Sequence, residues 1–216
     1  MFAAGFERLL ESHCTPALVR AAAADPAAAD GLAAQIAGSG FADLLLAESA
    51  GGAGLPLAGL APLVLACGAF LCPVDFPEQA VARRFGTVSA DAQAALMAGR
   101  IAGAARRLLE MTIAHVTTRQ QFGRPLAAFQ AVQQQLAVLA EEVAAATLAA
   151  EIGFSGPAFE TARSAAAKLR ANEAAGEAVR IAHQLHGAIG ATADYDLQLY
   201  SRALMRWQRE GGTSGH

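Results

Sequence analysis

Aromatic residues make up only 6% of the 216 residues, and runs of β-branched residues are nearly absent. β-Strands favour both kinds of residue, so the composition argues against a sheet. The hydrophobic fraction is nevertheless 54%, and much of it is alanine, the strongest helix former. A chain of this length can bury most of its apolar surface. We therefore expect a helical protein with a real core.

An excess of charge of one sign is also missing. The 16 basic and 19 acidic residues are interspersed and give a formal net charge of -3. No basic stripe of the kind that neutralises phosphates along a duplex is present. The sequence thus argues against nucleic acid as a partner.

The chain has only three cysteines, Cys14, Cys67 and Cys72, and they form neither a CxxC pair nor an even framework. This excludes a disulfide scaffold and favours buried free thiols in a reduced, cytoplasmic setting. The first 20 residues lack the basic and apolar regions of a signal peptide. The uncharged stretch 49–74 is interrupted by prolines and has acidic flanks, so we expect a buried helix there and no membrane span.

The sequence does contain segments that predict helices. Short helices are expected at 3–11, 27–39 and 60–70, separated by glycine-containing loops, with a connector at 83–87. These elements form a predicted N-terminal helical region, residues 1–86.

From Ser89 onward the apolar residues recur at steps of three and four. A first stripe contains Met97, Ile101, Ala104, Leu108, Met111 and His115. The pattern predicts helices near 89–118, 129–150, 157–186 and 197–207. Long amphipathic helices with short connections pack antiparallel, so the fold class is all-α, with an antiparallel four-helix bundle over 87–216.

The polar connection 117–126 places Arg119, Arg124 and Phe122 close together. A guanidinium at a helix end can bind phosphate oxygens, and a phenylalanine can stack on a planar ring. The alternative is that Arg119 complements the helix dipole and that Phe122 belongs to the core.

The segment 183–192 has glycines where one helix ends and another begins. Exposed backbone N–H groups there could hold an anion such as pyrophosphate, although a lone G-x-x-G is usually only a tight turn. His183 and His186 have metal-ligand spacing, but no carboxylate or cysteine clusters with them. Packing or hydrogen bonding is the favoured role of these histidines.

Together, in this order and spacing, the two segments resemble the C-terminal domain of acyl-CoA dehydrogenases. The family shows Arg-x-Gln-Phe-Gly-x-Pro followed by Phe-Gln, and it shows Gln-x-His-Gly-x-x-Gly. The matching residues are Arg119, Gln121, Phe122, Gly123, Pro125, Phe129, Gln130, Gln184, His186, Gly187 and Gly190. More weakly, Gly40-Phe41, Glu48 and the loop 51–54 are similar to the family's first helical domain.

The resemblance implies FAD-dependent oxidation of the Cα–Cβ bond of an acyl-CoA thioester, in which a carboxylate removes the α-proton. In the family, the two motifs contact the FAD of a neighbouring subunit. The implied cofactor-binding residues are Arg119, Gln121, Phe122, Gln184, Gly187, Gly190 and, from the C-terminal Gly-Gly-Thr, Thr213.

Two departures from the family are visible. The family's β-barrel domain lies between its helical domains, and only the segment 75–89 stands at that place here. The family's base is the glutamate of Glu-Gly-Thr, and Glu210 is one residue too far from Thr213. The alternative base position on the first long helix corresponds to about Ala92, with Asp91 next to it on a different face.

The sequence therefore predicts a subunit of acyl-CoA dehydrogenase type whose partner, a full-length homologue, supplies the β-domain and the base. A scaffold or regulatory homologue without flavin binding is the main alternative, and independent catalysis with Glu210 as the base is another. In the family, some helices pack against the β-barrel domain. Without that domain their apolar surface would face water, so a homo- or hetero-oligomer is expected.

Overall fold

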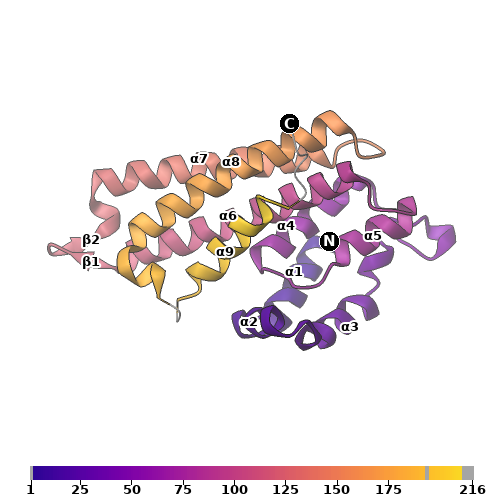
Figure 1. The fold of residues 1–216 in the computed structure, drawn as a ribbon, viewed down its shortest axis with the longest axis horizontal. Coiled ribbons are helices and arrows are strands. Elements are labelled where there is room, and N and C mark those ends of the chain that lie inside the picture. The colour runs from indigo at the N-terminus through magenta and orange to yellow at the C-terminus, as the bar shows by residue number, and fades with distance from the viewer. Residues whose placement is uncertain (1, 193–194, 211–216) are drawn as a thin grey trace.

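The computed structural model describes residues 2–192 and 195–210 and is helical apart from one short hairpin (Figure 1). Its α-helices are α1 (Phe2–His13), α2 (Pro16–Ala24), α3 (Asp30–Gly38), α4 (Ala61–Ala69), α5 (Phe76–Phe85), α6 (Ala90–Thr118), α7 (Gln130–Gly153), α8 (Thr161–His186) and α9 (Leu197–Trp207). The hairpin pairs β1 (Gln120–Gln121) with β2 (Arg124–Pro125) in antiparallel register. Single 3-10 turns occupy Pro26–Ala29, Phe41–Asp43, Glu48–Ala50, Leu57–Leu60, Leu126–Ala128 and Gly187–Ala191.

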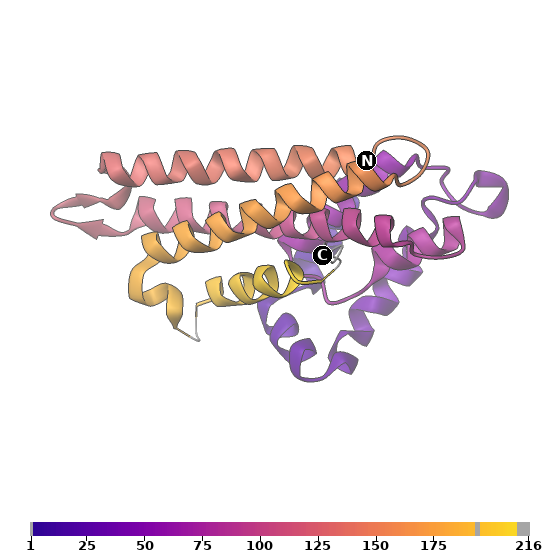
Figure 2. The same ribbon diagram turned by 45° about the horizontal axis from the view of Figure 1, so that its top comes forward.

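Helices α6 to α9 form the bundle that the periodicity predicts, and the all-α fold class is confirmed. Figure 2 shows α6, α7 and α8 as long neighbouring rods with the shorter α9 beside them. The start of α6 is set by Ser89, whose hydroxyl accepts a hydrogen bond from the Ala92 N–H at 3.2 Å. α8 begins at Thr161 rather than near 157, because the backbone is still extended at Glu160, with φ −131° and ψ 135°.

Helix α6 is packed tightly against α4 through two glycines. A Cβ atom on Gly103 would lie 1.9 Å from the Leu65 carbonyl oxygen, and one on Gly68 would lie 2.0 Å from that of Arg100. Both obstacles are backbone atoms, which cannot rotate away as a side chain does. The two helices therefore approach each other at a distance that only glycine permits.

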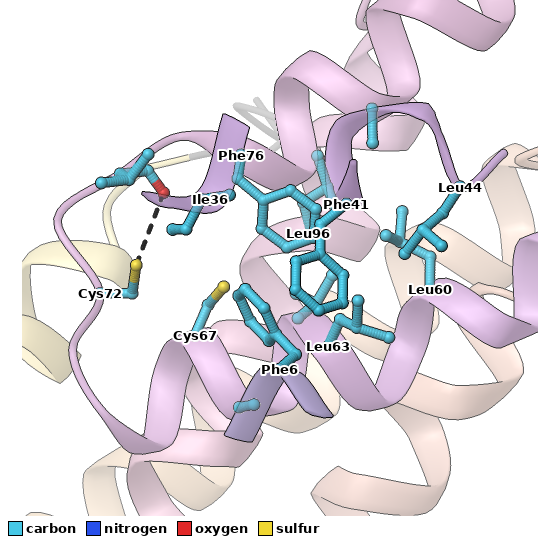
Figure 3. Packing of buried hydrophobic residues seen from close by; sticks show 14 of the residues in the cluster. Phe6, Ile36, Phe41, Leu44, Leu60, Leu63, Cys67, Cys72, Phe76 and Leu96 are labelled. Carbon is cyan, nitrogen blue, oxygen red and sulfur yellow. Dashed lines mark hydrogen bonds between the residues drawn. The ribbon is translucent and has the colours of Figure 1, made fainter. Parts of the chain in front are cut away.

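The core consists of two clusters that meet along α6. One lies between α6, α7, α8 and α9, and the other lies between the N-terminal helices and the start of α6. Figure 3 shows the second cluster, in which the Phe6 ring lies against the rings of Phe41 and Phe76 with centroids 4.9 and 4.8 Å away. Edge and tilted contacts of this kind are favoured by aromatic quadrupoles.

Two helices, α2 and α5, differ from the expectation drawn from the sequence. α2 is rich in alanine and has no fully buried residue, although Leu18, Val19 and Ala22 pack partly against the N-terminal core. α5 covers most of the expected connector 83–87: its Phe76 and Val81 are buried, and Gly86, at a φ of 79°, ends it. Only residues 86–89 then separate α5 from α6. The division into regions 1–86 and 87–216 stays a prediction.

The buried free thiols are confirmed, since Cys14, Cys67 and Cys72 are all buried and unpaired. The segment 49–74 contains the short buried helix α4. Within the described ranges, no helix combines the length and the apolar character needed to cross a membrane.

The contact between α4 and α6 gives a first prediction. Gly103→Ala should lower the free energy of unfolding by about 1–3 kcal/mol or more, because its methyl group meets backbone. Gly5→Ala in α1 is the matched control, since no neighbouring atom lies within 4 Å of the position that its Cβ would take. It should leave stability unchanged or raise it by up to about 1 kcal/mol through helix propensity. Chemical denaturation measures both, and equal effects would contradict the close-approach account.

Candidate functional site

A cavity of about 780 Å³ lies at the end of the bundle that carries the β1–β2 hairpin. His115, Thr118 and Arg119 line it from the end of α6. Leu126 lines it from the turn Leu126–Ala128, and Val132 lines it from the beginning of α7. Residues 184–189 line it from the end of α8 and the turn that follows. Its volume lies in the range of small-molecule sites, roughly 300–1,000 Å³. The cavity brings together Arg119, Gln121, Gln184 and Gly187 from the two sequence motifs.

Arg119 is held at the end of α6 by its backbone. Its N–H donates to the His115 carbonyl at 2.8 Å, and its carbonyl accepts from the Leu126 N–H at 2.9 Å. The second bond closes the hairpin, which places Gln121 on the cavity wall. Arg124 instead lies with its Cζ 4.0 Å from the centroid of the Phe129 ring.

Phe122 is not a core residue: its side chain is 90% exposed at the hairpin tip. Both residues of the turn have positive φ, 53° for Phe122 and 77° for Gly123. This is the pattern of a type I′ turn, and it is unfavourable for a bulky residue. The Phe122 and Phe129 rings lie in a T-shaped arrangement, with centroids 6.2 Å apart. It is therefore available to a partner outside the chain.

The two predicted glycines of the second motif have different surroundings. Gly187 ends α8 at a φ of 60°, and open space surrounds its Cβ position. Gly190 is packed, because a Cβ there would lie 2.8 Å from Leu197 Cδ2 and 3.0 Å from His186 Cβ. Gly187 lines the cavity, whereas Gly190 allows the following turn to pack.

The histidines make hydrogen bonds and stacking contacts, the role that the sequence favours for them. His183 Nε2 lies 2.7 Å from Ser201 Oγ, and His186 Nδ1 lies 2.8 Å from the Ala182 carbonyl oxygen. The rings of His186 and His115 are stacked, with centroids 4.3 Å apart. The Tyr195 ring lies against the His186 ring, with centroids 5.3 Å apart.

Burial lowers the pKa of both stacked histidines. For His115 the positive charge of Arg119 lowers the pKa further. For His186 the neighbouring His115 and His183 act in the same direction, against a hydrogen bond to Ala182 that raises the pKa. In the sequence, His115 stands out only as a member of the α6 stripe, and no local signal indicates that it faces a cavity.

Glu210 is not brought into this cavity. It follows α9, and its carboxylate lies 3.5 Å from the Arg206 guanidinium on the surface. The end of α9 is held by the buried Lys168, whose Nζ donates to the Trp207 carbonyl at 2.9 Å. Lys168 lies about five turns before His186 on α8, roughly 27 Å at about 1.5 Å per residue. The predicted base and the predicted cofactor residues are therefore far apart, and Thr213 lies outside the described residues.

The alternative base position, about Ala92, carries no carboxylate. Ala92 is buried. The neighbouring Asp91 accepts a hydrogen bond from the Thr161 hydroxyl at 2.9 Å, which ties α6 to the start of α8.

This chain is similar in sequence to a known protein family and to several of its members. The family model "Acyl-CoA dehydrogenase, C-terminal domain" matches residues 79–215. The chain is 40% identical over 111 residues to the acyl-CoA dehydrogenase IpdE2 of Mycolicibacterium smegmatis, covering 51% of this chain and 35% of the relative. It is 35% identical over 114 residues to a 3-sulfinopropanoyl-CoA desulfinase of Paraburkholderia xenovorans, covering 52% and 29%. The chain thus spans about a third of the length of these curated relatives.

Two solved structures share the fold over nearly the whole chain. A variant of the Tcur3481-Tcur3483 steroid ACAD superposes with a TM-score of 0.82 at 19% identity, covering 97% of this chain and 92% of that one. The ChsE4-ChsE5 complex of Mycobacterium tuberculosis gives 0.76 at 15% identity, covering 95% and 91%. At these identities the likeness concerns the fold.

The lowered pKa values of His115 and His186 predict a loss of stability in mild acid. The unfolded chain takes up protons near pH 6.5, above the folded-state pKa of either ring, so stability falls as the pH drops through that value. We expect the melting temperature to decrease between pH 7.5 and 5.5, and to decrease less in His115→Phe, which keeps a stacked ring. An identical decrease in both proteins would contradict the assignment.

Proposed function

This chain belongs to the acyl-CoA dehydrogenase family, and we propose that it is a subunit that contributes to FAD-dependent α,β-dehydrogenation of an acyl-CoA thioester. The observation that carries the proposal is the cavity in which both sequence motifs meet. A bound flavin would supply the hydride acceptor for that reaction. The residues of this chain bind and orient part of the cofactor.

The residues present fit such a role. Arg119 offers a guanidinium, the group best suited to bidentate binding of phosphate oxygens. Among the described residues that line the cavity none is acidic, so none of them repels an anion. The exposed Phe122 ring beside the cavity offers a flat apolar surface to a planar ring or to a partner. Gln121 and Gln184 add amide groups, one from the hairpin and one from the end of α8.

We propose that the rest of the flavin site comes from a partner subunit. Residues 86–89 are too few for the β-barrel domain that the family places between its helical domains. Two structures of the same fold carry names that join two proteins, Tcur3481 with Tcur3483 and ChsE4 with ChsE5. The partner would supply the isoalloxazine pocket and the base, because Glu210 lies far from the cavity and is exposed.

A scaffold role without flavin binding is the second candidate. It is supported by the same position of Glu210, whose carboxylate is exposed, paired with Arg206 and far from the cavity. In that case the cavity would be a remnant of the fold, and its residues could change without effect.

Arg119→Ala distinguishes the two roles in a complex co-purified with the partner. If Arg119 binds the cofactor, flavin content at limiting FAD should fall, with about a 10- to 100-fold weaker affinity for the loss of a hydrogen bond to a charged group. Arg202→Ala is the matched control, since Arg202 is an exposed arginine on α9 that does not line the cavity. Wild-type flavin content in Arg119→Ala would favour the scaffold.

Phe122→Asn separates binding from stability. Asparagine tolerates positive φ, and the exposed ring buries little area, so the free energy of unfolding should change by less than about 0.5 kcal/mol. Association with the partner or retention of FAD should nevertheless weaken, as measured by analytical ultracentrifugation and absorbance. A variant that assembles and retains flavin as the wild type does would remove Phe122 from the site.

A further inference from the structure

Three cysteines from separate parts of the chain meet in the N-terminal core. Cys14 follows α1, Cys67 lies in α4 and Cys72 follows α4, and Figure 3 shows Cys67 and Cys72 at one edge of the cluster. The Cys14 thiol donates to the carbonyl of Phe70, two residues before Cys72, at 3.3 Å. Hydrogen bonds link the Cys72 thiol to the thiols of Cys14 and Cys67. Cys72 is therefore the centre of the group.

The turn that ends α4 brings Cys72 back beside Cys67. The Cys72 N–H donates to the Cys67 carbonyl at 2.8 Å, and the Leu71 N–H donates to the Gly68 carbonyl at 3.1 Å. This pair of bonds is the Schellman pattern, whose residue with positive φ is usually glycine. Here that residue is Leu71, at a φ of 51°, which is unfavourable for a bulky side chain. A strained turn thus positions Cys72, and strain of this kind is often found at functional positions.

Two of the three cysteines lie beside open space. Cys72 lines a cavity of about 440 Å³ between α2 and α9, and Cys14 lines an adjoining cavity of about 210 Å³. Cys67 lines neither cavity and is only 1% exposed. A molecule as small as a peroxide can therefore approach Cys14 and Cys72, whereas Cys67 is enclosed by the core.

The surroundings favour the thiolate form of Cys72. Hydrogen bonds from the Cys14 and Cys67 thiols lower the pKa of Cys72, burial raises it, and the positive charge of Arg100 lowers it further. The net direction is downward. The contact with Cys72, together with burial, raises the pKa of Cys14. Because the thiolate is the form that reacts with oxidants, Cys72 is the thiol of the group that reacts first.

The arrangement suits a disulfide better than a metal ion. Within the described ranges, no three histidine, cysteine or carboxylate side chains are grouped in a way that could hold a metal. Two thiols in contact need no further ligand to form a disulfide.

We propose that Cys72 and Cys14 form a site of reversible oxidation by hydrogen peroxide, at which a disulfide joins the end of α1 to the turn after α4. The Cys72 thiolate attacks one oxygen of the peroxide and becomes a sulfenic acid, with release of hydroxide. The Cys14 sulfur then attacks the Cys72 sulfur, and the sulfenic hydroxyl leaves with the Cys14 proton as water. Hydroxide takes up the proton that Cys72 lost on ionisation. In sum, two thiols are oxidised to a disulfide and one peroxide is reduced to two water molecules.

The disulfide would fasten α2 to the core. α2 has no fully buried residue and is held through the partly buried Leu18, Val19 and Ala22. It begins two residues after Cys14, so a crosslink at Cys14 fixes its first turn. Since α2 is also one wall of the cavity of about 440 Å³, oxidation would make that wall more rigid.

Treatment of the folded chain with millimolar hydrogen peroxide tests the proposal. Free thiols, counted after denaturation, should fall from the three of the reduced chain to one. Peptide mapping should find Cys14 joined to Cys72 within one chain. The melting temperature should rise by about 5–10 °C, and dithiothreitol should reverse the rise. Hydrogen exchange should become slower in α2 and stay unchanged in α7.

Two alanine variants separate the roles of the cysteines, each compared before and after peroxide. Cys72→Ala should keep both remaining thiols free and show no rise in melting temperature, because Cys72 is the residue that reacts with peroxide. Cys67→Ala is the matched control in the same core, and it should form the disulfide as the wild type does.

Four results would overturn the proposal: three thiols that stay free in the wild type, a disulfide between two chains, a bond between Cys67 and Cys72, and sulfinic acid at Cys72 beside a free Cys14. A Cys72→Ala variant that loses its two thiols would overturn it as well. The wild-type peptide map does not depend on the folding of any variant. The proposed function is tested separately, because neither Cys14 nor Cys72 lines the cavity at the end of the bundle.

Discussion

The close packing of α6 against its neighbours is the constraint on which the rest of the structure depends. Over its 29 residues, α6 contributes Ala92, Ala95 and Leu96 to the N-terminal core and continues into the core of the bundle. Gly68 and Gly103 let α4 approach it to backbone contact. The two parts of the chain are thus joined by one rigid helix. The same helix carries His115 and Arg119 to the cavity at its far end.

The C-terminal helices could be predicted from the sequence because each has a long apolar stripe. Apolar residues that recur every three or four positions indicate a helix and not a strand. α2 was not predicted, because it is short and rich in alanine, and only Leu18, Val19 and Ala22 pack, partly buried, against the N-terminal core. The end of α5 looks like a connector in the sequence because Arg83, Arg84 and Gly86 dominate it. The burial of Phe76 and Val81 against the N-terminal core shows that tertiary packing decides its structure.

The candidate site was predictable in its outline and not in its detail. The motifs contain Arg119, Gln121, Gln184 and Gly187, and the fold gathers them on one cavity. The sequence leaves open whether Phe122 is a core residue, whereas the two positive φ angles of its turn carry it into solvent. The stacking of His115 on His186 joins residues far apart in the chain, and no local pattern indicates it.

The departures from the family concern chemistry more than architecture. The helical fold is intact, yet the connection 86–89 leaves no room for a barrel domain, and Glu210 is paired on the surface. The function that we propose divides the site between subunits, with this chain holding one part of the cofactor and the partner holding the reacting end. That division would account for a cavity whose described lining residues include an arginine and two glutamines and no carboxylate.

Photolabelling of the reconstituted complex with an azido-adenine analogue of FAD tests this account most directly. Peptide mapping should locate the label on this chain, within residues 115–132 or 183–190, and competition by FAD should abolish it. Label confined to the partner subunit, or found on this chain near Glu210, would contradict the claim that this cavity binds the cofactor.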